Sequence, residues 1–597
     1  MKDNSSCRTV AATRETTATS HRTGSFTASV LRILAVSSLV VMASVVVVLT
    51  SSLAQAGGIW NNASEVTGTA TLNVGGGAQV NAVSCTAPGS CSAIGSYSTT
   101  AAISQVFVLN ETRGTWGSAV VLPGFIALNT GGVAGTGLVI SCSSAGNCGA
   151  GGSYADSAGD PHAFVANEIH GTWGSAVEVP GFAILNTGGL VGSLLSISCA
   201  SNGNCSAGGV YGDTSDNVQA FVVNETGGTW GDAEEVPGSG GLNAGNAAFI
   251  GAMSCSSAGN CGAGGYYTDA SNDGQAFVVN ETGATWGNAI EVPGTSTLNA
   301  GGTALVDSIA CPATGSCTAV GDYLTSAKVT QAFTVDESAG TWASAAPVTG
   351  VNASGATSLT SLACASVGNC TAGGGYNDVN GNSQAFTLSE TSGVWGAPSE
   401  LAGSGSLNAG NNAAVEAIAC TLPGDCSVTG YYNDASNNQQ AFVANQSDGI
   451  FASAIEIPGT GALNTDGNAF TGSISCGVDG ACSTGGYYED SSQNYQSFVV
   501  NSAATFKVPP TPRVKVDSVR RGVLSVTVLN PSATGGRPIL DYQYSLNGGG
   551  WRDVPGRPSV HIRIDRLTAL ATYRVSLRAV NAVGIGAASR VVRLAVQ

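Results

Sequence analysis

The chain has 597 residues, of which 84 are glycine and only 10% are charged. This length allows a large hydrophobic core and more than one domain. Acidic residues outnumber basic ones by 38 to 21, and residues 57–507 alone contain 32 acidic residues and three basic ones. Such a segment repels phosphate groups, so its charge argues against nucleic acid as a partner.

Residues 1–56 have the pattern of a signal peptide. Lys2 and four arginines surround or precede an apolar run from Ile33 to Leu49, and Ala54-Gln55-Ala56 has the small-x-small pattern of a signal-peptidase site. We therefore expect this segment to be removed and the mature protein to be secreted or held at the cell surface. The alternative is an uncleaved anchor, because an apolar run of this length nearly spans a bilayer.

Residues 57–502 are an array of repeats, which pairs of cysteines mark. Each copy contains a Cys-x5-Cys pair, and successive pairs are 53 to 57 residues apart. Such a period indicates repeated supersecondary units. Short, regular cysteine spacing predicts disulfides in an oxidising compartment, whereas zinc would need four Cys or His ligands per ion. The predicted disulfides are Cys85–Cys91, Cys142–Cys148, Cys199–Cys205, Cys255–Cys261, Cys311–Cys317, Cys364–Cys370, Cys420–Cys426 and Cys476–Cys482.

Each copy contains four predicted β-strands separated by turn residues. In the fourth copy they are residues 250–255, 261–266, 275–280 and 286–292. Trp286, Ile290 and Val292 in the last of these are predicted to share one face, because side chains alternate along a strand. Four short strands in about 55 residues, repeated along the chain, are typical of a β-propeller blade.

The array starts with a fourth strand at Trp60 and ends with a third strand at Gln496. In a closed ring the N-terminal strand would complete the last blade and leave no free sheet edge. We therefore predict an all-β protein containing an eight-bladed β-propeller closed by its N-terminal strand. Seven blades plus a degenerate one are the alternative.

Two stretches of the repeat resemble known families. Asn280–Trp286 (NETGATW) resembles a degenerate Asp-box of sialidase-type propellers, and residues 151–165 resemble HAF-type extracellular repeats of bacteria. The first resemblance implies a structural turn whose aromatic ring packs between sheets, and neither implies an activity. A sialidase needs an arginine cluster, and this array contains only Arg113. The Asn-Glu-Thr sequons at Asn110, Asn224 and Asn280 are predicted to be turn residues.

The loops after the second strand are expected on one rim of the propeller and carry oxygen-bearing side chains at alternate positions. This pattern resembles the start of a calcium-binding loop, although the later bidentate carboxylate is missing. Ordinary tight turns prefer the same residue types, so both interpretations stay open. The candidate calcium ligands are Asp213, Asp269, Asp273, Asp378, Asp434 and Asp490.

Tyrosines precede these loops. An aromatic ring beside acids and amides suits sugar binding, but a tyrosine repeated in every blade also suits packing between blades. The candidate binding residues are Tyr154, Tyr211, Tyr266, Tyr376, Tyr432 and Tyr488.

Residues 503–512 are proline-rich and predict a linker. Residues 513–597 resemble a fibronectin type III domain in Val523–Val528, Leu567, Tyr573 and the stretch 579–581. The resemblance implies a β-sandwich that serves as a spacer or binding accessory. Val528 stands where the family usually keeps a core tryptophan.

No catalytic residues are predicted, because a catalytic carboxylate pair should break the repeat and the acids recur with it. We expect a secreted or cell-surface binding or scaffold protein, monomeric, whose propeller rim contacts a glycan, peptide or ion. Its expected partners are an extracellular glycan, wall polymer or protein, with membrane contact only through an uncleaved signal segment and calcium as the one conceivable cofactor. The alternative is a secreted polysaccharide-degrading glycosidase or its carbohydrate-binding accessory.

Overall fold

The computed structural model describes residues 59–595 apart from 88, 101–102, 134–136, 352–354, 466, 478–479, 504–507, 521–522, 530–538, 556–558, 566, 569–571 and 582. The predicted signal segment, residues 1–56, lies outside this part of the chain. The described residues form mainly antiparallel β-sheets, which confirms the all-β class. None of the helices found there is long and apolar enough to cross a membrane.

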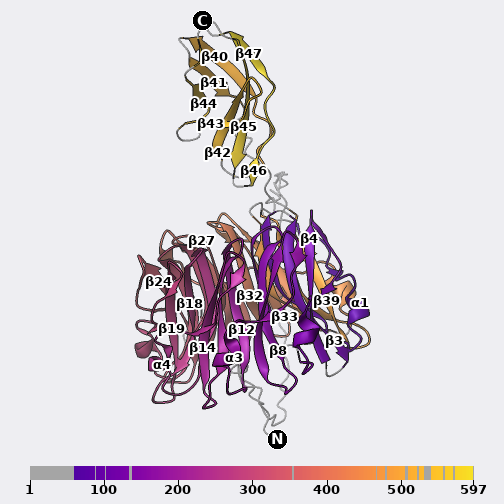
Figure 1. Cartoon of the computed structure of the whole chain (residues 1–597), viewed down its shortest axis with the longest axis vertical. Coiled ribbons are helices and arrows are strands. Elements are labelled where there is room, and N and C mark those ends of the chain that lie inside the picture. Colours follow the sequence, from indigo (N-terminus) through magenta and orange to yellow (C-terminus); the bar gives the residue numbers. More distant parts are fainter. Residues whose placement is uncertain are drawn as a thin grey trace, which may run out of the picture. The chain divides into compact units, whose positions relative to one another are not determined.

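Eight antiparallel sheets repeat along the array, and Figure 1 shows them side by side. In the fourth sheet, β17 (Ala248–Ser257), β18 (Asn260–Thr268) and β19 (Gly274–Thr282) are neighbours in chain order. Two short strands, β20 (Thr285–Trp286) and β21 (Ile290–Glu291), both pair with β19.

The other sheets have the same plan. The first three consist of β2 (Gln79–Ala87), β3 (Ser90–Thr100), β4 (Ile103–Thr112), β5 (Thr115–Trp116) and β6 (Val120–Val121); β7 (Val139–Ser144), β8 (Asn147–Ala155), β9 (Pro161–Ile169), β10 (Thr172–Trp173) and β11 (Val177–Glu178); and β12 (Gly192–Ser201), β13 (Asn204–Gly212), β14 (Val218–Thr226), β15 (Thr229–Trp230) and β16 (Glu234–Glu235). The fifth to seventh consist of β22 (Ala304–Ala313), β23 (Ser316–Leu324), β24 (Thr330–Ser338), β25 (Thr341–Trp342) and β26 (Ala346–Pro347); β27 (Thr357–Ser366), β28 (Asn369–Asn377), β29 (Ser383–Thr391), β30 (Val394–Trp395) and β31 (Ser399–Glu400); and β32 (Ala413–Leu422), β33 (Asp425–Asn433), β34 (Gln439–Ser447), β35 (Ile450–Phe451) and β36 (Ile455–Glu456).

One-turn helices lie between the last short strand of a sheet and the first strand of the next. They are α1 (Thr69–Leu72), α2 (Phe125–Leu128), α3 (Phe182–Leu185), α4 (Ser239–Leu242), α5 (Thr295–Leu298), α6 (Ser404–Leu407) and α7 (Thr460–Leu463).

The N-terminal strand completes the eighth sheet, as the sequence predicts. That sheet contains β37 (Ala469–Cys476), β38 (Cys482–Glu489), β39 (Tyr495–Asn501) and β1 (Ser64–Glu65). Ser64 lies opposite Val499, and Trp60 forms a further bridge to Ser502. Strand β2 of the first sheet contacts β37, β38 and β39, and Figure 1 shows the orange β39 beside the indigo strands. The first and last sheets of the array are therefore packed together.

The predicted fourth strand is broken, and one of its predicted facing residues is wrong. The N–H of Gly287 donates to the Asn280 carbonyl, which separates β20 from β21. Trp286 and Val292 are buried, but Ile290 is 45% exposed and Ala289 is buried instead. Alternation of side chains holds only along an unbroken strand, so the break shifts which residues face inward.

The eight predicted disulfides are confirmed. Each joins the first and second strands of a sheet; Cys255 and Cys261, for example, lie directly opposite each other. In the loop-entropy description, a loop this short contributes roughly 2 kcal/mol per bridge. One phenylalanine per sheet is also fully buried, as Phe277 is in the fourth sheet, and each contributes about 2–3 kcal/mol to folding.

The C-terminal residues form two sheets around one core. The first contains β40 (Val514–Arg520), β41 (Val523–Val528) and β44 (His561–Ile564), and the second contains β42 (Ile539–Leu546), β43 (Arg552–Asp553), β45 (Thr572–Asn581), β46 (Gly584–Ile585) and β47 (Val592–Ala595). Leu524 and Ile562 from the first sheet pack with Tyr542 and Leu577 from the second. Val528 is buried in this core.

Candidate binding sites

The tyrosines predicted for sugar binding are built into the sheets. Tyr211 is 3% exposed, and its hydroxyl donates a 3.3 Å hydrogen bond to Glu235 in the last strand of the same sheet. Burial, followed by the nearby Glu235 carboxylate, raises the pKa of Tyr211. The same bond joins Tyr376 to Glu400, Tyr432 to Glu456 and Tyr488 to Glu65, while Tyr154 stacks on His162. All five except Tyr376 are buried.

Tyr266 does not belong to this set. The equivalent residue is Tyr267, which lies opposite Gln275 as Tyr211 lies opposite Gln219. The Tyr267 hydroxyl donates to Glu291, whereas Tyr266 lies on the other face of β18 and stacks on Phe249 with ring centroids 5.5 Å apart. Two tyrosines are adjacent here, and the sequence-based prediction selected Tyr266, which is one residue before the equivalent of Tyr211.

The candidate calcium ligands close tight turns. One Asp269 carboxylate oxygen accepts hydrogen bonds from the backbone N–H groups of Ser271 and Asp273, at 2.7 and 3.1 Å. A hydrogen bond from Gln275 lowers the pKa of Asp269, and the two backbone hydrogen bonds lower it further. Partial desolvation acts in the opposite direction but is outweighed. The same pair of backbone bonds is made by Asp213, Asp378, Asp434 and Asp490. These aspartates lie in five different sheets, and only Asp269 and Asp273 share a loop.

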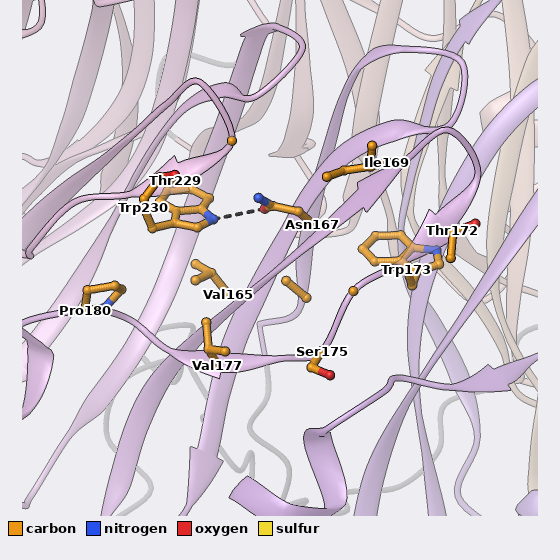
Figure 2. Close-up of a pocket in the computed structure, with 13 residues that line it drawn as sticks. Val165, Asn167, Ile169, Thr172, Trp173, Ser175, Val177, Pro180, Thr229 and Trp230 are labelled. Atoms are coloured by element: carbon orange, nitrogen blue, oxygen red, sulfur yellow. Dashed lines mark hydrogen bonds between the residues drawn. The ribbon is translucent and has the colours of Figure 1, made fainter.

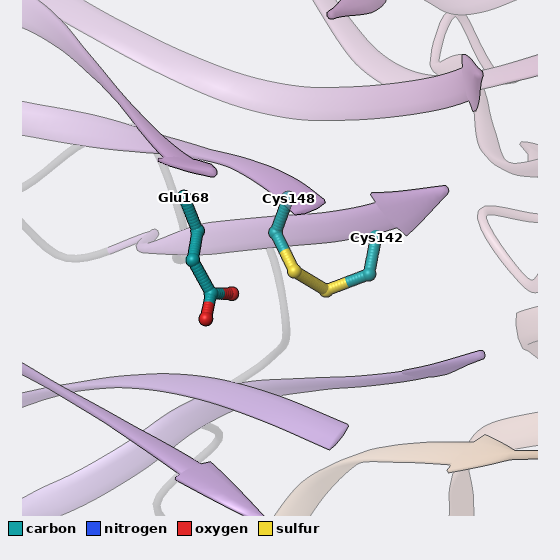
Figure 3. Close-up of side chains that lie close together, drawn as sticks. All are labelled: Cys142, Cys148 and Glu168. Atoms are coloured by element: carbon teal, nitrogen blue, oxygen red, sulfur yellow. A yellow bond between two sulfur atoms is a disulfide. The ribbon is translucent and has the colours of Figure 1, made fainter. Parts of the chain in front are cut away.

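Two groups of potential metal ligands lie together among the described residues, and both contain a disulfide. Figure 3 shows one of them, Cys142, Cys148 and Glu168, whose ligand atoms lie within 4.8 Å of one another. The sulfurs are bonded to each other, so they supply no thiolate. The Glu168 carboxylate already accepts hydrogen bonds from Ser92 and Asn110. The group therefore lacks the free donors that a metal site needs.

Adjacent sheets are joined by a hydrogen-bonded set that we call the boundary clamp. The Asn224 side-chain oxygen accepts a 3.2 Å bond from Trp286 Nε1, and its amide nitrogen donates a 2.6 Å bond to Glu281. Both partners belong to the next sheet. Four other boundaries have the same clamp: Trp116, Asn501 and Glu111; Trp173, Asn110 and Glu168; Trp230, Asn167 and Glu225; and Trp342, Asn280 and Glu337. The sequon asparagines thus lie in strands and not in turns, so that prediction was wrong.

A groove of about 490 Å³ lies between the second and third sheets, where Figure 2 shows Trp173 and Trp230 on opposite sides of Asn167. Its wall includes Ile169, 54% exposed, and Val177, 47% exposed. Both indole N–H groups are already bonded within boundary clamps. The groove therefore presents mainly aliphatic side chains and ring faces.

One pair of positions, which we call the variable pair, holds chemically different side chains from sheet to sheet. In the fourth sheet the first residue of this pair is Gly251, a β-bulge between Ile250 and Ala252, and the second is Tyr266. The equivalents are Asn81 and Ser96; Leu195 and Val210; Asp307 and Asp322; Thr360 and Gly375; Glu416 and Tyr431; and Gly472 and Tyr487. Bulges commonly redirect side chains beside binding sites.

In three sheets the two members of the variable pair lie close enough to interact. The Ser96 hydroxyl donates a 3.3 Å hydrogen bond to Asn81. Burial raises the pKa of Asp322, and the charge of the Asp307 carboxylate raises it further. Burial raises the pKa of Glu416 to about 7, and its charge contributes to the raised pKa of Tyr431. Contrary to the sequence-based expectation, these three acids break the repeat.

Aromatic rings gather around the same positions in the seventh and eighth sheets. Tyr431 lies 6.2 Å from Phe470, which lies 5.9 Å from Tyr487, and Tyr487 lies 4.9 Å from Tyr495, all between ring centroids. Aligning the copies on their cysteines and searching for positions that vary would have found these residues from the sequence. The recurring tyrosines and aspartates, by contrast, form hydrogen bonds within the sheets and turns of the repeat.

No family model matches the sequence, and no curated protein sequence matches it. Among solved structures, a protein of unknown function from Dyadobacter fermentans is 11% identical, with a match that covers 75% of this chain and 100% of that chain at a TM-score of 0.33. A subtype N11 neuraminidase-like protein of A/flat-faced bat/Peru is 11% identical over 52% of this chain and 87% of that chain, at a TM-score of 0.30. Similarity this low carries no argument about the fold or the function of the chain.

Proposed function

We propose that this chain is a secreted or cell-surface glycan-binding protein, in which residues 57–502 form an eight-bladed β-propeller. Supporting this architecture, Trp116, Asn501 and Glu111 join the last sheet to the first with the same boundary clamp that joins internal neighbours. Eight disulfides favour an oxidising, extracellular compartment. We expect a monomer whose signal segment, residues 1–56, is removed.

In the same proposal, a linker at residues 503–512 leads to a fibronectin type III domain at residues 513–597. Two sheets with a common core support this assignment. The Tyr573 hydroxyl accepts a 2.9 Å hydrogen bond from the Thr568 N–H, like the tyrosine corner of such sandwiches. The strongly basic composition of residues 508–597 would suit an anionic wall polymer.

The observation that carries the binding function is the variable pair. The recurring clamp residues, tyrosines and cysteines hold the sheets together. The variable pair instead holds amide, acid, aromatic and aliphatic side chains in different sheets. Acids beside aromatic rings provide the flat apolar faces and hydrogen-bonding groups that sugars need. The ligand is therefore proposed to bind where the variable pairs lie, and not at the recurring tyrosines.

Tyr266 and Tyr267 are adjacent but lie on opposite faces of β18, so substituting each in turn tests the binding function with a matched control. We expect Tyr266→Ala to weaken glycan binding about tenfold, or about 1.4 kcal/mol, while Tyr267→Phe removes only the bond to Glu291 and leaves affinity unchanged. A glycan array would identify the ligand, and calorimetry on the whole disulfide-bonded chain would measure both variants. Equal binding by the two variants and the wild type would contradict a site at the variable pairs.

A second candidate function is polysaccharide hydrolysis, which the non-repeating pair Asp307 and Asp322 favours. A buried acid with a raised pKa beside a second carboxyl is the arrangement used by glycosidases. Release of reducing ends by the wild type, abolished by Asp307→Asn, would support it. Binding without release of reducing ends would support the non-enzymatic function.

A further inference from the structure

Among the residues that the structure describes, no basic side chain forms an ion pair with the acids of the variable pairs. Residues 57–507 contain only Arg113, Lys328 and Lys507 as basic residues apart from histidine. Lys328 is engaged with the Gly301 carbonyl, and Arg113 lies in the turn between β4 and β5. A carboxylate removed from water without a counter-charge is strongly destabilised, so it either keeps a proton or receives a cation.

Asp307 and Asp322 show this condition most clearly. Asp307 Oδ2 is buried and has no hydrogen-bond partner among the described residues. Asp322 accepts a 3.1 Å bond from the Leu359 N–H of the next sheet, which holds its side chain in place. Burial raises the pKa of both carboxyl groups, and the Asp307 charge raises that of Asp322 further. The pair therefore offers a ligand hydrogen-bond acceptors, among them Asp307 Oδ2, that no protein donor occupies.

Aromatic rings lie on the strands that pack beside these acids. Strand β22, which carries Asp307, contacts β17 and β18, which carry the stacked Phe249 and Tyr266. Strand β32, which carries Glu416, contacts β37, which carries Phe470. Ring faces together with carboxylates recognise organic cations, whereas a hard metal ion is bound by oxygen ligands alone. The surroundings therefore favour an ammonium group over a metal ion.

We propose that Asp307 and Asp322 form a subsite for a protonated amine, so that the ligand of the variable-pair site is a glycan that carries free amino groups. This inference rests on the proposed glycan-binding function and names its ligand class. The amine would donate to the orphaned Asp307 oxygen, and the neighbouring rings would contact the sugar. Carboxyl groups that hold a proton in the free protein would release it when the cation binds.

The test compares three oligosaccharides of equal length on the whole disulfide-bonded chain: a glucosamine oligomer, its N-acetylated form and a glucose oligomer. We expect the glucosamine oligomer to bind at least about tenfold more tightly than the other two, since a charge-assisted hydrogen bond contributes that much or more. Calorimetry in buffers of different ionisation enthalpy should record proton release on binding. Asp307→Asn and Asp322→Asn should remove both the preference and the proton release.

Two controls separate the possible outcomes. Asp269→Asn, a carboxylate in a turn of the adjacent sheet, should leave the preference unchanged. Calcium alone should give no binding heat; calcium binding that Asp307→Asn abolishes would overturn the amine assignment in favour of a metal site. Equal binding of all three oligomers, lost in Tyr266→Ala, would overturn this inference and leave the proposed function standing. Absence of binding by any glycan would overturn both.

Discussion

The Tyr488 hydroxyl donates a 3.2 Å hydrogen bond to Glu65, which precedes it by 423 residues. In the seventh sheet the equivalent bond, from Tyr432 to Glu456, spans only 24 residues. Strand β1 thus takes the place in the eighth sheet that a local strand takes in the others. The N-terminal segment is therefore part of the eighth sheet.

Removal of residues up to Val66 should destabilise the protein. The deletion eliminates β1 and the Trp60 bridge and leaves β39 as an edge strand paired only with β38. An unpaired strand edge promotes association. We expect a lower melting temperature and oligomers in light scattering after size exclusion. A monomer with wild-type melting temperature would contradict the role assigned to β1.

Substitution of a clamp asparagine should cost more than substitution of a surface asparagine. Asn224→Ala leaves Trp286 Nε1 and Glu281 Oε1 without their partner, at about 2–4 kcal/mol for two unsatisfied groups, while Ser206 still donates to Glu281 Oε2. Denaturant unfolding would measure the difference in free energy. Asn288→Ala, at an exposed position of the next copy, should change stability by less than about 0.5 kcal/mol.

The boundary between the fifth and sixth sheets should be sensitive to pH. Asp336 replaces the clamp asparagine there, and Trp395 Nε1 and one Glu390 oxygen are buried without a hydrogen-bond partner among the described residues. Burial, reinforced by the Asp336 charge, raises the pKa of Glu390 from 4.5 to about 7. The folded state therefore binds this proton more tightly than the unfolded state, and the stability it confers is present below about pH 4.5 and is lost as the pH rises to about 7.

Glu390→Gln should remove that part of the pH dependence. Its melting temperature should exceed that of the wild type at pH 8 and approach it at pH 4, because glutamine avoids the buried charge. Melting curves between these values would show the difference growing within the window. Asp448→Asn, an exposed turn substitution, should run parallel to the wild type. A constant difference across the pH range would refute the titration of Glu390.

The aspartate turns should hold without calcium. Because Asp269 is already bonded to two backbone N–H groups, Asp269→Asn, which keeps an acceptor, should preserve the melting temperature, whereas Asp269→Ala should lose about 1 kcal/mol or less. Calcium and chelator should leave all three proteins unchanged in thermal unfolding. A calcium-dependent rise in the wild type that disappears in Asp269→Asn would show that the loop is a metal site.

The repeat period, the disulfides and the completion of the eighth sheet by β1 could all be predicted, because cysteine spacing and strand order are written directly in the sequence. The break between Trp286 and Ile290 could not, since it depends on a backbone hydrogen bond from Gly287. The candidate site was missed for a related reason. A β-bulge such as the one at Asp307 carries no residue signature. The strand register places Leu305 opposite Asp322, and the nearness of the two carboxyl groups shows only in the effect of the Asp307 charge on the pKa of Asp322.

Because of the bulge, the first residue of the variable pair is not among the residues that pair the strands of its sheet. A bulged residue has no partner directly opposite it, so glycine at 251, aspartate at 307 and glutamate at 416 occupy the same backbone without altering the ladder around them. Gene duplication can therefore supply identical sheets, and later point changes at these positions can make each one chemically distinct. A scaffold of repeated sheets would in this way acquire, at the proposed binding positions, side chains that differ from one sheet to the next.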